Sequence, residues 1–296
     1  GSVNYDLVIE VDKTPVIGET VFGRNFFQSG GGKGANQAIA CARLGANTSF
    51  IGAVGDDAFG AELLSSLKNN NVDVSSVKTV SDRPTGTAMI ILHEGDNYIA
   101  VDQGANLAVD ELQINSADEK ISSADMVVLQ LEIPLDTVRY VITWCRKHGV
   151  PVILNPAPAP KEALDSELLK MVDVLTPNET EAFALTGIMP STPDEAIKAA
   201  MRLTELGANQ VAITMGASGC VYGAGADFRH MPTVKVENVV DTTAAGDSFT
   251  AALAVSLSEG RNLEQAVEFA TRVAAITVTK KGAHPSLPYR KDVVIG

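Results

Sequence analysis

Hydrophobic residues recur with two different spacings along the second half of the chain. Short, almost continuous apolar runs indicate strands buried on both faces. Longer segments whose apolar residues recur every three to four positions indicate helices. Strands are expected at 48–54, 126–131, 150–154, 172–175 and 210–215, with shorter ones at 219–222 and 233–236. Helices are expected at 35–44, 59–70, 135–148, 179–185, 194–206, 245–258 and 263–279.

This alternation predicts an α/β fold built on a doubly wound, mostly parallel sheet. The early strands differ, because no helix separates the strands expected at 7–11 and 20–27, and none separates the two strands of the hairpin at 85–92 and 98–102. We therefore expect a small separate sheet, such as a lid, from about 3–27 and 84–103, within a single domain over residues 1–296.

The composition narrows the function classes. Apolar residues make up 45% of the 296 residues and charged residues 20%, and the formal net charge is −13. The sequence has no Lys/Arg-rich run, which argues against nucleic acid as a partner, and no apolar run long enough to span a membrane. Three scattered cysteines form no C-x-x-C pair, and the N-terminus lacks a signal-peptide pattern. These features favour a cytoplasmic enzyme.

Four residues stand at or just after the ends of apolar runs: Glu132, Asn155, Asn178 and Gly216. In an open parallel sheet, ligands gather outside the carboxyl ends of the strands. The side chains of the first three can bind hydroxyls, phosphates or a metal, although strand ends favour such residues in any case.

The strongest local signal is the segment 241–249, Asp-Thr-Thr-Ala-Ala-Gly-Asp-Ser-Phe, where a long helix is expected to begin. The first turn of a helix has unpaired N–H groups and a partial positive charge. The amides of Ala245, Gly246 and Asp247 are therefore candidates to hold a phosphoryl group in transfer, with the Asp247 carboxylate as base. The alternative is that Asp247 is only a favourable first-turn acid, and the segment alone does not decide.

The glycine run at 30–37 resembles a phosphate loop but does not match one. Gly34 follows Lys33 where a Walker A loop needs Ser or Thr, and Phe27 stands where it needs Gly. A strict dinucleotide fingerprint fails at Gln37, and only its looser form ending in Ala35 fits. The run is either a glycine-rich turn into a helix or a loop that presents Lys33 and Asn36 to polyol hydroxyls.

The segment 176–181 reads Thr-Pro-Asn-Glu-Thr-Glu. Asn178 and Glu181 have the N-cap and N3 spacing of a variant capping box. The same two side chains are suited to orient water molecules around Mg²⁺, and both roles are compatible.

Taken together, these segments resemble the ribokinase (PfkB) family of carbohydrate kinases over essentially the whole chain. The resemblance rests on the order and spacing of Asn4–Asp6, 31–37, 130–132, 155–158, 176–181, 241–247 and 279–283. It implies a three-layer α/β/α sandwich with a small β-sheet lid. It also implies transfer of the γ-phosphoryl group of ATP to O5 of D-ribose, with Mg²⁺ and K⁺ as cofactors. Pairing of two chains through the lid is a further expectation.

The resemblance also implies residue roles. The sugar would contact Asn4, Asp6, Gly32, Lys33, Asn36, Glu132 and Asp247. ATP would contact Asn178, Thr214, Gly216, Ala217, Ser218, Gly219, Gly246 and Thr271. The anion hole would comprise Ala244, Ala245 and Gly246, beside the base Asp247. Mg²⁺ would be served by Asn178 and, through water, by Glu181. K⁺ would be held by Asp241, Thr243, Thr277, Lys280, Gly282 and Ser286.

Three rival functions stay open. The sugar acceptor is alternatively 2-deoxyribose, fructose or a nucleoside. A sensor that binds sugar or nucleotide without catalysis is a second possibility, and a nucleotide-dependent dehydrogenase is a third that rests only on the loose glycine match. Family members also have a strand before the position of Gly1, so the resemblance predicts a central sheet that lacks one strand.

Overall fold

Four parallel strands form the centre of the larger body in the computed structural model, which describes residues 1–94, 96–160 and 164–293. They are β7 (Val127–Leu129), β8 (Val152–Leu154), β9 (Val174–Leu175) and β10 (Gln210–Thr214), side by side in this order. Two antiparallel strands, β11 (Cys220–Ala224) and β12 (Asp227–Met231), extend the sheet at one edge. The predicted mostly parallel sheet is confirmed.

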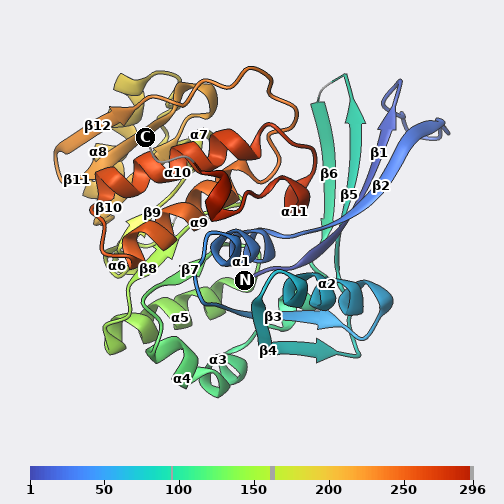
Figure 1. The fold of residues 1–296 in the computed structure, drawn as a ribbon, viewed down its shortest axis with the longest axis horizontal. Coiled ribbons are helices and arrows are strands. Elements are labelled where there is room, and N and C mark those ends of the chain that lie inside the picture. Colours follow the sequence, from blue (N-terminus) through green and yellow to red (C-terminus); the bar gives the residue numbers. More distant parts are fainter. Residues whose placement is uncertain (95, 161–163, 294–296) are drawn as a thin grey trace.

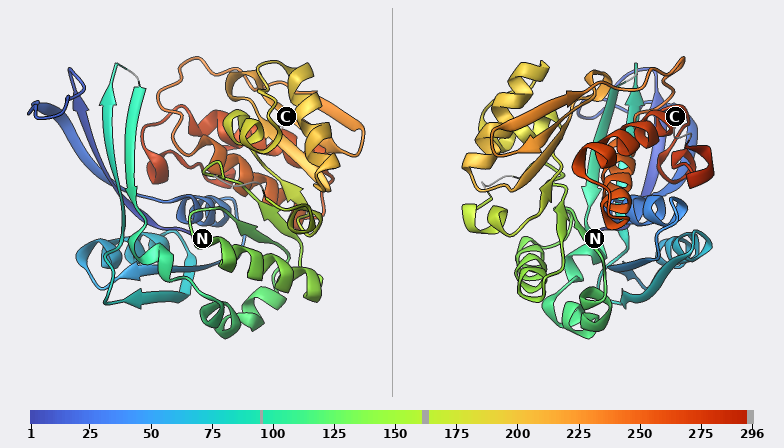
Figure 2. Two further views of the ribbon diagram at one scale, coloured as in Figure 1. Left: turned by 180° about the vertical axis from the view of Figure 1, so that it is seen from behind. Right: turned by 60° about the vertical axis from the view of Figure 1, so that its left-hand side comes forward.

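Helices cover both faces of this sheet (Figures 1 and 2). On β8, Val152 and Leu154 join one hydrophobic core, whereas Ile153 between them joins another. This alternation follows from the two-residue period of a strand. The first core includes side chains of α5 (Leu135–His148), α6 (Ser166–Lys170), α7 (Glu179–Thr186) and α8 (Pro193–Glu205). The second includes α9 (Ala245–Ser258) and α10 (Leu263–Thr277). The expected three-layer α/β/α arrangement is therefore present.

A second, two-stranded sheet continues the body beyond β7. It contains β3 (Thr48–Gly55) and β4 (Val72–Val80), parallel to each other and connected by α2 (Ala58–Asn69). A cavity of about 560 Å³ lies between the two sheets, lined by Phe50 and Ile51 of β3 and by all three residues of β7.

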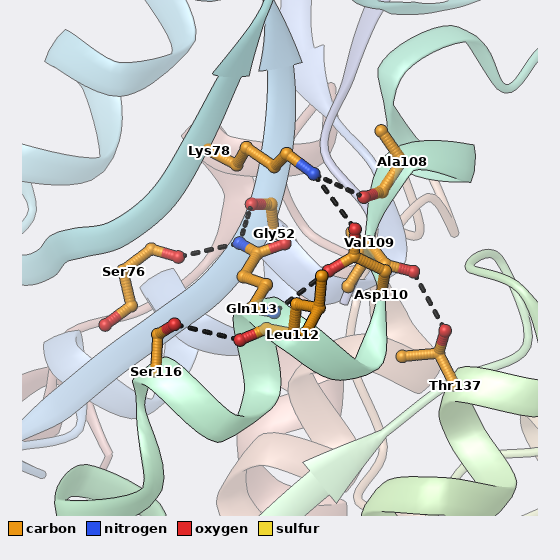
Figure 3. Close-up of polar contacts among 10 residues, drawn as sticks. All are labelled: Gly52, Ser76, Lys78, Ala108, Val109, Asp110, Leu112, Gln113, Ser116 and Thr137. Atoms are coloured by element: carbon orange, nitrogen blue, oxygen red, sulfur yellow. Dashed lines mark hydrogen bonds and ion pairs between the residues drawn. The ribbon is translucent and has the colours of Figure 1, made fainter.

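Polar side chains join this small sheet to the neighbouring helices (Figure 3). Gln113 donates from Nε2 to the carbonyl oxygens of Gly52, at 2.7 Å, and Ser76, at 2.8 Å. Lys78 of β4 pairs with Asp110 at 3.0 Å. These contacts fix α3 (Glu111–Ser116) against β3 and β4.

A four-stranded sheet projects from the body (Figures 1 and 2). Its strands are β1 (Asn4–Val11), β2 (Gly23–Gly31), β5 (Gly86–His93) and β6 (Asp96–Asp102), in the order β2-β1-β5-β6. Every residue of β6 is exposed. This sheet, called the lid below, matches the separate sheet expected from about 3–27 and 84–103, although β2 begins and ends later. The single-domain prediction over 1–296 extends past the described residues and stays a prediction.

The remaining elements are short. They are α1 (Lys33–Arg43), α4 (Asp118–Ser122), α11 (Ala283–Ser286) and the 3₁₀ helices η1 (Gly104–Ala108), η2 (Gly216–Ser218) and η3 (Arg290–Asp292). In the described part of the chain, no helix is both long and apolar enough to cross a membrane. The expected cytoplasmic location stays a prediction.

The strand expected at 233–236 is wrong. Residues 232–244 form no helix or strand, and the last strand of the sheet is β12, before Pro232. A proline has no N–H for a sheet ladder, and β12 itself is an edge strand with a mostly polar, exposed sequence. Strand β4 was not predicted from the sequence. Only part of its surface is buried, and a register shift interrupts its pairing with β3.

Candidate active site

A cavity of about 190 Å³ lies where the carboxyl ends of β8, β9 and β10 meet the beginning of α9. It is lined by Lys33, Asn155, Ala157, Thr176, Asn178, Glu181, Thr214, Thr242, Ala244, Gly246, Asp247 and Thr250. The structure therefore brings together the glycine turn, the segment 241–249 and three of the four predicted strand ends. These strand ends are represented by Asn155, by Asn178 and by Thr214 near Gly216. This is the side of a parallel sheet at which ligands bind.

The N-terminus of α9 is open toward this cavity. Ala244 precedes the helix in the left-handed conformation, with φ of 61°, and provides no side-chain cap. The Ala245 amide donates to the carbonyl oxygen of Thr242 at 3.2 Å, but the amides of Gly246 and Asp247 have no acceptor among the described residues. Two free N–H groups at the positive end of a 14-residue helix form a site for an anion.

Asp247 stands beside these amides. Its side chain is only 7% exposed, yet it lines the cavity. Its Oδ2 accepts a hydrogen bond from Asn36 Nδ2 at 2.8 Å, and its Oδ1 accepts one from Gln37 Nε2 at 2.9 Å. Both donors come from α1, 210 or more positions earlier in the chain. The carboxylate is thus held in one orientation, close to where an anion would bind.

The glycine turn before α1 is filled by the protein itself. The Lys33 amide donates to Glu132 Oε2 at 3.0 Å, the Gly34 amide to Ser2 Oγ at 3.2 Å, and the Ala35 amide to the Ser2 carbonyl at 2.8 Å. Gly32 has a φ of 86°, and a Cβ there would lie 2.8 Å from the backbone nitrogen of Asn4. The glycine therefore permits close approach of the chain, and Glu132 occupies the place that an anion would take.

Lys33 places its side chain in the cavity. Burial lowers the pKa of its ammonium group, but the carboxylates of Asp247, Glu132 and Glu181 outweigh that effect, and the net shift of the pKa is upward. Lys33 is therefore a fixed positive charge among three acidic side chains, as a site for phosphate transfer requires.

Asn4 and Asp6 approach the same region from β1 of the lid. Asn106 of η1 donates from Nδ2 to Asn4 Oδ1 at 2.7 Å, and it also bonds the backbone nitrogen and oxygen of Val3 at 2.9 and 3.2 Å. Burial, and then the charges of Glu132 and Asp247, raise the pKa of Asp6 to about 7. Among the described residues, none donates a hydrogen bond to the Asp6 side chain, so this carboxyl group is available to a ligand.

The residues expected to bind ATP lie on the other side of the cavity. Asn178 caps α7, accepting from the Glu181 amide at 2.9 Å, while Glu181 accepts from the backbone and side-chain nitrogens of Asn178. The predicted capping box is confirmed. Thr214 ends β10 beside Asn178, and the exposed turn of Gly216, Ala217 and Ser218 follows, with Gly219 buried after it. Thr271 lies apart, buried in α10, and its hydroxyl donates to the Val267 carbonyl.

Of the residues expected to hold a monovalent cation, hydrogen bonds bring together Asp241, Thr243 and Gly282. Asp241 accepts from the amide and hydroxyl of Thr243 through Oδ1, and from the Gly282 amide through Oδ2. The Lys280 amide donates to the Thr277 carbonyl, and Ser286 bonds within its own turn. Burial raises the pKa of Asp241, but the Thr243 and Gly282 donors outweigh it, so the net shift is downward and the group stays ionised.

The available donors suit the two cations that the resemblance implies. Around Asp241 they are carboxylate, hydroxyl and carbonyl oxygens, which hard cations prefer. At Asn178 and Glu181, both carboxylate oxygens already accept hydrogen bonds from Asn178, so this pair fits Mg²⁺ through water better than by direct ligation. Among the described residues, no cluster of three or more His, Cys, Asp or Glu side chains forms a metal site of its own.

These features define the class of the protein. An acidic base beside an open helix N-terminus, a buried lysine and polar groups for a polyol form the site of a kinase that acts on an alcohol. The chain belongs to the pfkB family of carbohydrate kinases, because the model of that family matches residues 1–290.

Relatives with known activity are similar over almost the whole chain. A ribokinase of Bacillus subtilis strain 168 is 44% identical over 293 residues, covering 99% of this chain and 96% of its own. A ribokinase of Mus musculus is 41% identical, covering 99% and 92%. The solved structure of Arabidopsis thaliana ribokinase complexed with ribose and ATP is 37% identical, with a TM-score of 0.92 and coverage of 99% and 95%.

Gln37, Asn106 and Gln130 shape the site but were not singled out from the sequence for a role, and Asn155 was singled out only as a possible ligand at the end of a strand. Gln37 contacts Asp247, Asn106 holds Asn4, and Gln130 and Asn155 contact Gln37. Gln37, Gln130 and Asn155 do lie within the segments that carry the family resemblance, and Asn155 ends an apolar run. Their roles depend on contacts between distant parts of the chain, for which the sequence offers no local signal.

Proposed function

We propose that this chain transfers the γ-phosphoryl group of ATP to O5 of D-ribose and releases ADP and D-ribose 5-phosphate. The observation that carries the proposal is the buried Asp247 carboxylate beside the unpartnered amides of Gly246 and Asp247. Relatives named ribokinase, 37–44% identical over 99% of the chain, support ribose as the acceptor.

Asp247 accepts the proton of the sugar hydroxyl as its oxygen attacks the γ-phosphorus in line. The negative charge that develops on the phosphoryl oxygens is stabilised by the free amides of Gly246 and Asp247 and by the Lys33 ammonium group. Asn178 and Glu181 would hold the water molecules of Mg²⁺ bound with ATP, which would neutralise charge at the phosphates. The oxygens around Asp241 would hold K⁺, which would add a positive charge beside the turn that begins α9.

The sugar is bound by side chains from the lid and from the body. Asn4 and Asp6 on the lid, and Lys33, Asn36 and Glu132 on the body, provide donors and acceptors for its hydroxyls. The Asp6 carboxyl, buried without a hydrogen-bond donor from the described residues, gains its partners from a 2,3-diol. A 2-deoxy sugar provides one donor fewer, which favours ribose over 2-deoxyribose.

Two chains pair through their lids in this proposal. The register of β1, β5 and β6 places Asp6, Ala88 and Val101 opposite one another, so Ile99, two positions from Val101, shares the face of the sugar ligand Asp6. Ile99 is 55% exposed and Val101 48% exposed. Exposed apolar side chains on a projecting sheet are suited to a contact between copies that also excludes water from the sugar. Sedimentation of Ile99→Glu against the wild-type chain tests this pairing, which predicts a lower mass for the variant.

ADP release measured with ATP, Mg²⁺ and K⁺ tests the activity, with D-ribose, 2-deoxyribose, fructose and a nucleoside as acceptors. We expect D-ribose to be the best substrate and its product to be phosphorylated at O5, as determined by NMR. Faster turnover of another acceptor reassigns the substrate. Sugar and ATP binding without ADP release indicates a sensor, and tight NADH binding without ATP binding indicates a dehydrogenase.

A further inference from the structure

Gln37 lies behind the catalytic centre and does not face it. Its side chain is only 2% exposed, and it is absent from the residues that line the site cavity. Its Nε2 donates both to Asp247 Oδ1, at 2.9 Å, and to Asn155 Oδ1, at 3.1 Å. Its Oε1 accepts from Gln130 Nε2 at 2.5 Å. Gln37 therefore touches the base, and its buried amide is fully engaged by protein partners.

The orientation of the Gln37 amide is fixed from two independent directions. A backbone carbonyl can only accept, so Asn155 must turn Nδ2 toward the Thr176 carbonyl, which lies 2.7 Å away. Asn155 Oδ1 then faces Gln37, which must present Nε2. An ionised carboxylate also only accepts, so Asp247 makes the same demand on Gln37. Both conditions are met by one amide orientation, and Gln130 satisfies the oxygen that remains.

This arrangement stabilises one charge state of the base. A donor that hydrogen-bonds a carboxylate favours its ionised form, and the effect is larger where water is excluded. Asn36 also donates to Asp247, but under the proposed function it is shared with the sugar. Gln37 is buried and all of its polar groups have protein partners. Unlike Asn36, it therefore donates to Asp247 without also binding the sugar.

We propose that Gln37 is a positioning residue that keeps Asp247 ionised and aimed at the sugar hydroxyl, with Asn155 and Gln130 holding Gln37 in place. The proposal rests on the proposed function, because it assigns Asp247 as the base. It predicts that loss of the Gln37 donor makes Asp247 harder to ionise.

Asp6, Lys33 and Glu181 also interact with the charge of Asp247, and Glu132 lies beside them, but these four groups are unchanged when Gln37 is replaced. The test is therefore the difference in the pH dependence of kcat/KM for D-ribose between the wild-type chain and Gln37→Met, which keeps the shape of the side chain but cannot donate. A hydrogen bond to a charged group is worth enough to move the acidic limb of the profile upward by roughly one to two pH units. Gln37→Glu places a second carboxyl group against Asp247 and moves the limb further upward, because the two groups share a proton. A role limited to packing predicts an equal loss of activity at every pH.

Two controls separate a specific effect from general damage. Gln113→Met removes an amide that bridges two backbone carbonyls (Figure 3). Gln113 does not line the site cavity, so its loss lowers the melting temperature without moving the acidic limb. Gln130→Met acts on Asp247 only through Gln37. It therefore produces a smaller shift than Gln37→Met, and no additional shift when the two substitutions are combined.

A measurement without turnover distinguishes failure of this inference from failure of the proposed function. The carboxyl ¹³C signal of Asp247, identified by its loss in Asp247→Asn, is titrated in the wild-type chain and in Gln37→Met. A higher titration midpoint in the variant supports the inference even if no sugar is phosphorylated. Equal midpoints, or equal acidic limbs in folded variants, overturn it whether or not the chain is a ribose kinase.

Discussion

Two helices begin at the site, and they differ in what occupies their first turns. Helix α1 follows a run of glycines that resembles a phosphate loop, yet its first three amides donate to Glu132 and Ser2. Helix α9 follows Ala244, in a segment with one glycine, and the amides of Gly246 and Asp247 have no acceptor in the described structure. Glycines at α1 thus allow close packing of the chain, while the anion site forms at α9.

The comparison shows that glycine content does not identify an anion site. A helix N-terminus attracts an anion only if its amides are free, and at α1 the protein supplies its own carboxylate. That carboxylate belongs to Glu132, which is also a predicted sugar ligand. Stability of the α1 turn and sugar binding therefore depend on one side chain, whereas α9 remains free for phosphate.

The largest expected effect is at α9. Replacing Asp247 with Ala removes the base and lowers kcat by at least about 10²–10⁴-fold. ATP binding persists, because the substitution leaves the backbone amides in place. Stopped-assay turnover and calorimetry with a non-hydrolysable ATP analogue measure the two quantities. Near-normal turnover in this variant excludes Asp247 as the base.

Asp6 senses the charges at both helices, since Glu132 and Asp247 each raise its pKa, after burial. Its pKa is about 7 in the folded chain and near 3.9 when unfolded. Between these values the folded state binds more protons, so the free energy of unfolding falls as pH rises from about 4 to about 7. The Asp6→Asn variant does not lose stability in this way. Across that pH range its free energy of unfolding therefore becomes roughly 2–4 kcal/mol higher than that of the wild-type chain.

Urea unfolding of both proteins at pH 4 and at pH 8 measures this difference. The two stabilities should converge below pH 4, where Asp6 is neutral in both states. Parallel stability curves over the whole range would contradict the raised pKa. Asp73 is an exposed carboxylate paired with Lys120, and this partner lowers the pKa of Asp73. Asp73→Asn therefore provides a control in which the pH dependence of stability changes with the opposite sign.

Glu132→Leu tests the occupied helix. It leaves the Lys33 amide and the Ser2 hydroxyl without their acceptor, and such unpaired groups cost about 1–3 kcal/mol. The expected result is a lower free energy of unfolding together with a raised KM for the sugar. Unchanged stability would show that the α1 turn does not depend on the Glu132 carboxylate.

The smallest effect is expected from Asn106→Leu. Asn106 does not reach the cavity but fixes Asn4 and the Val3 backbone. Its loss is therefore expected to raise the KM for the sugar by about tenfold, which is equivalent to one buried hydrogen bond, and to change kcat little. Asn209→Leu is the control, because Asn209 likewise donates two hydrogen bonds from its side-chain amide, to the carbonyl oxygens of Lys170 and Val172, and it does not line the site cavity. Equal changes in KM for both variants would contradict a positioning role.

Local patterns in the sequence predicted most of the fold. The bounds expected for α5 and α9 agree with the structure. The apolar residues of α5 recur with a helical period and Gly149 follows its end, whereas α9 is buried at every position from Asp247 to Ser256. The buried strands β8 to β10 were also predicted from their apolar runs. Strands β4 and β12 were not predicted. Their exposed, polar residues are also typical of a loop, and only pairing with a neighbouring strand identifies them as strands.

The sequence by itself determined the candidate base and the segment that precedes α9, because a helix start is a local property of the chain. Only the tertiary structure decided which of two helix starts stays open, since Glu132 reaches the α1 turn across 99 positions. It also decided that Gln37 meets Asp247 across 210 positions. Contacts at such separations depend on how strands and helices pack, and no short pattern of residues specifies them.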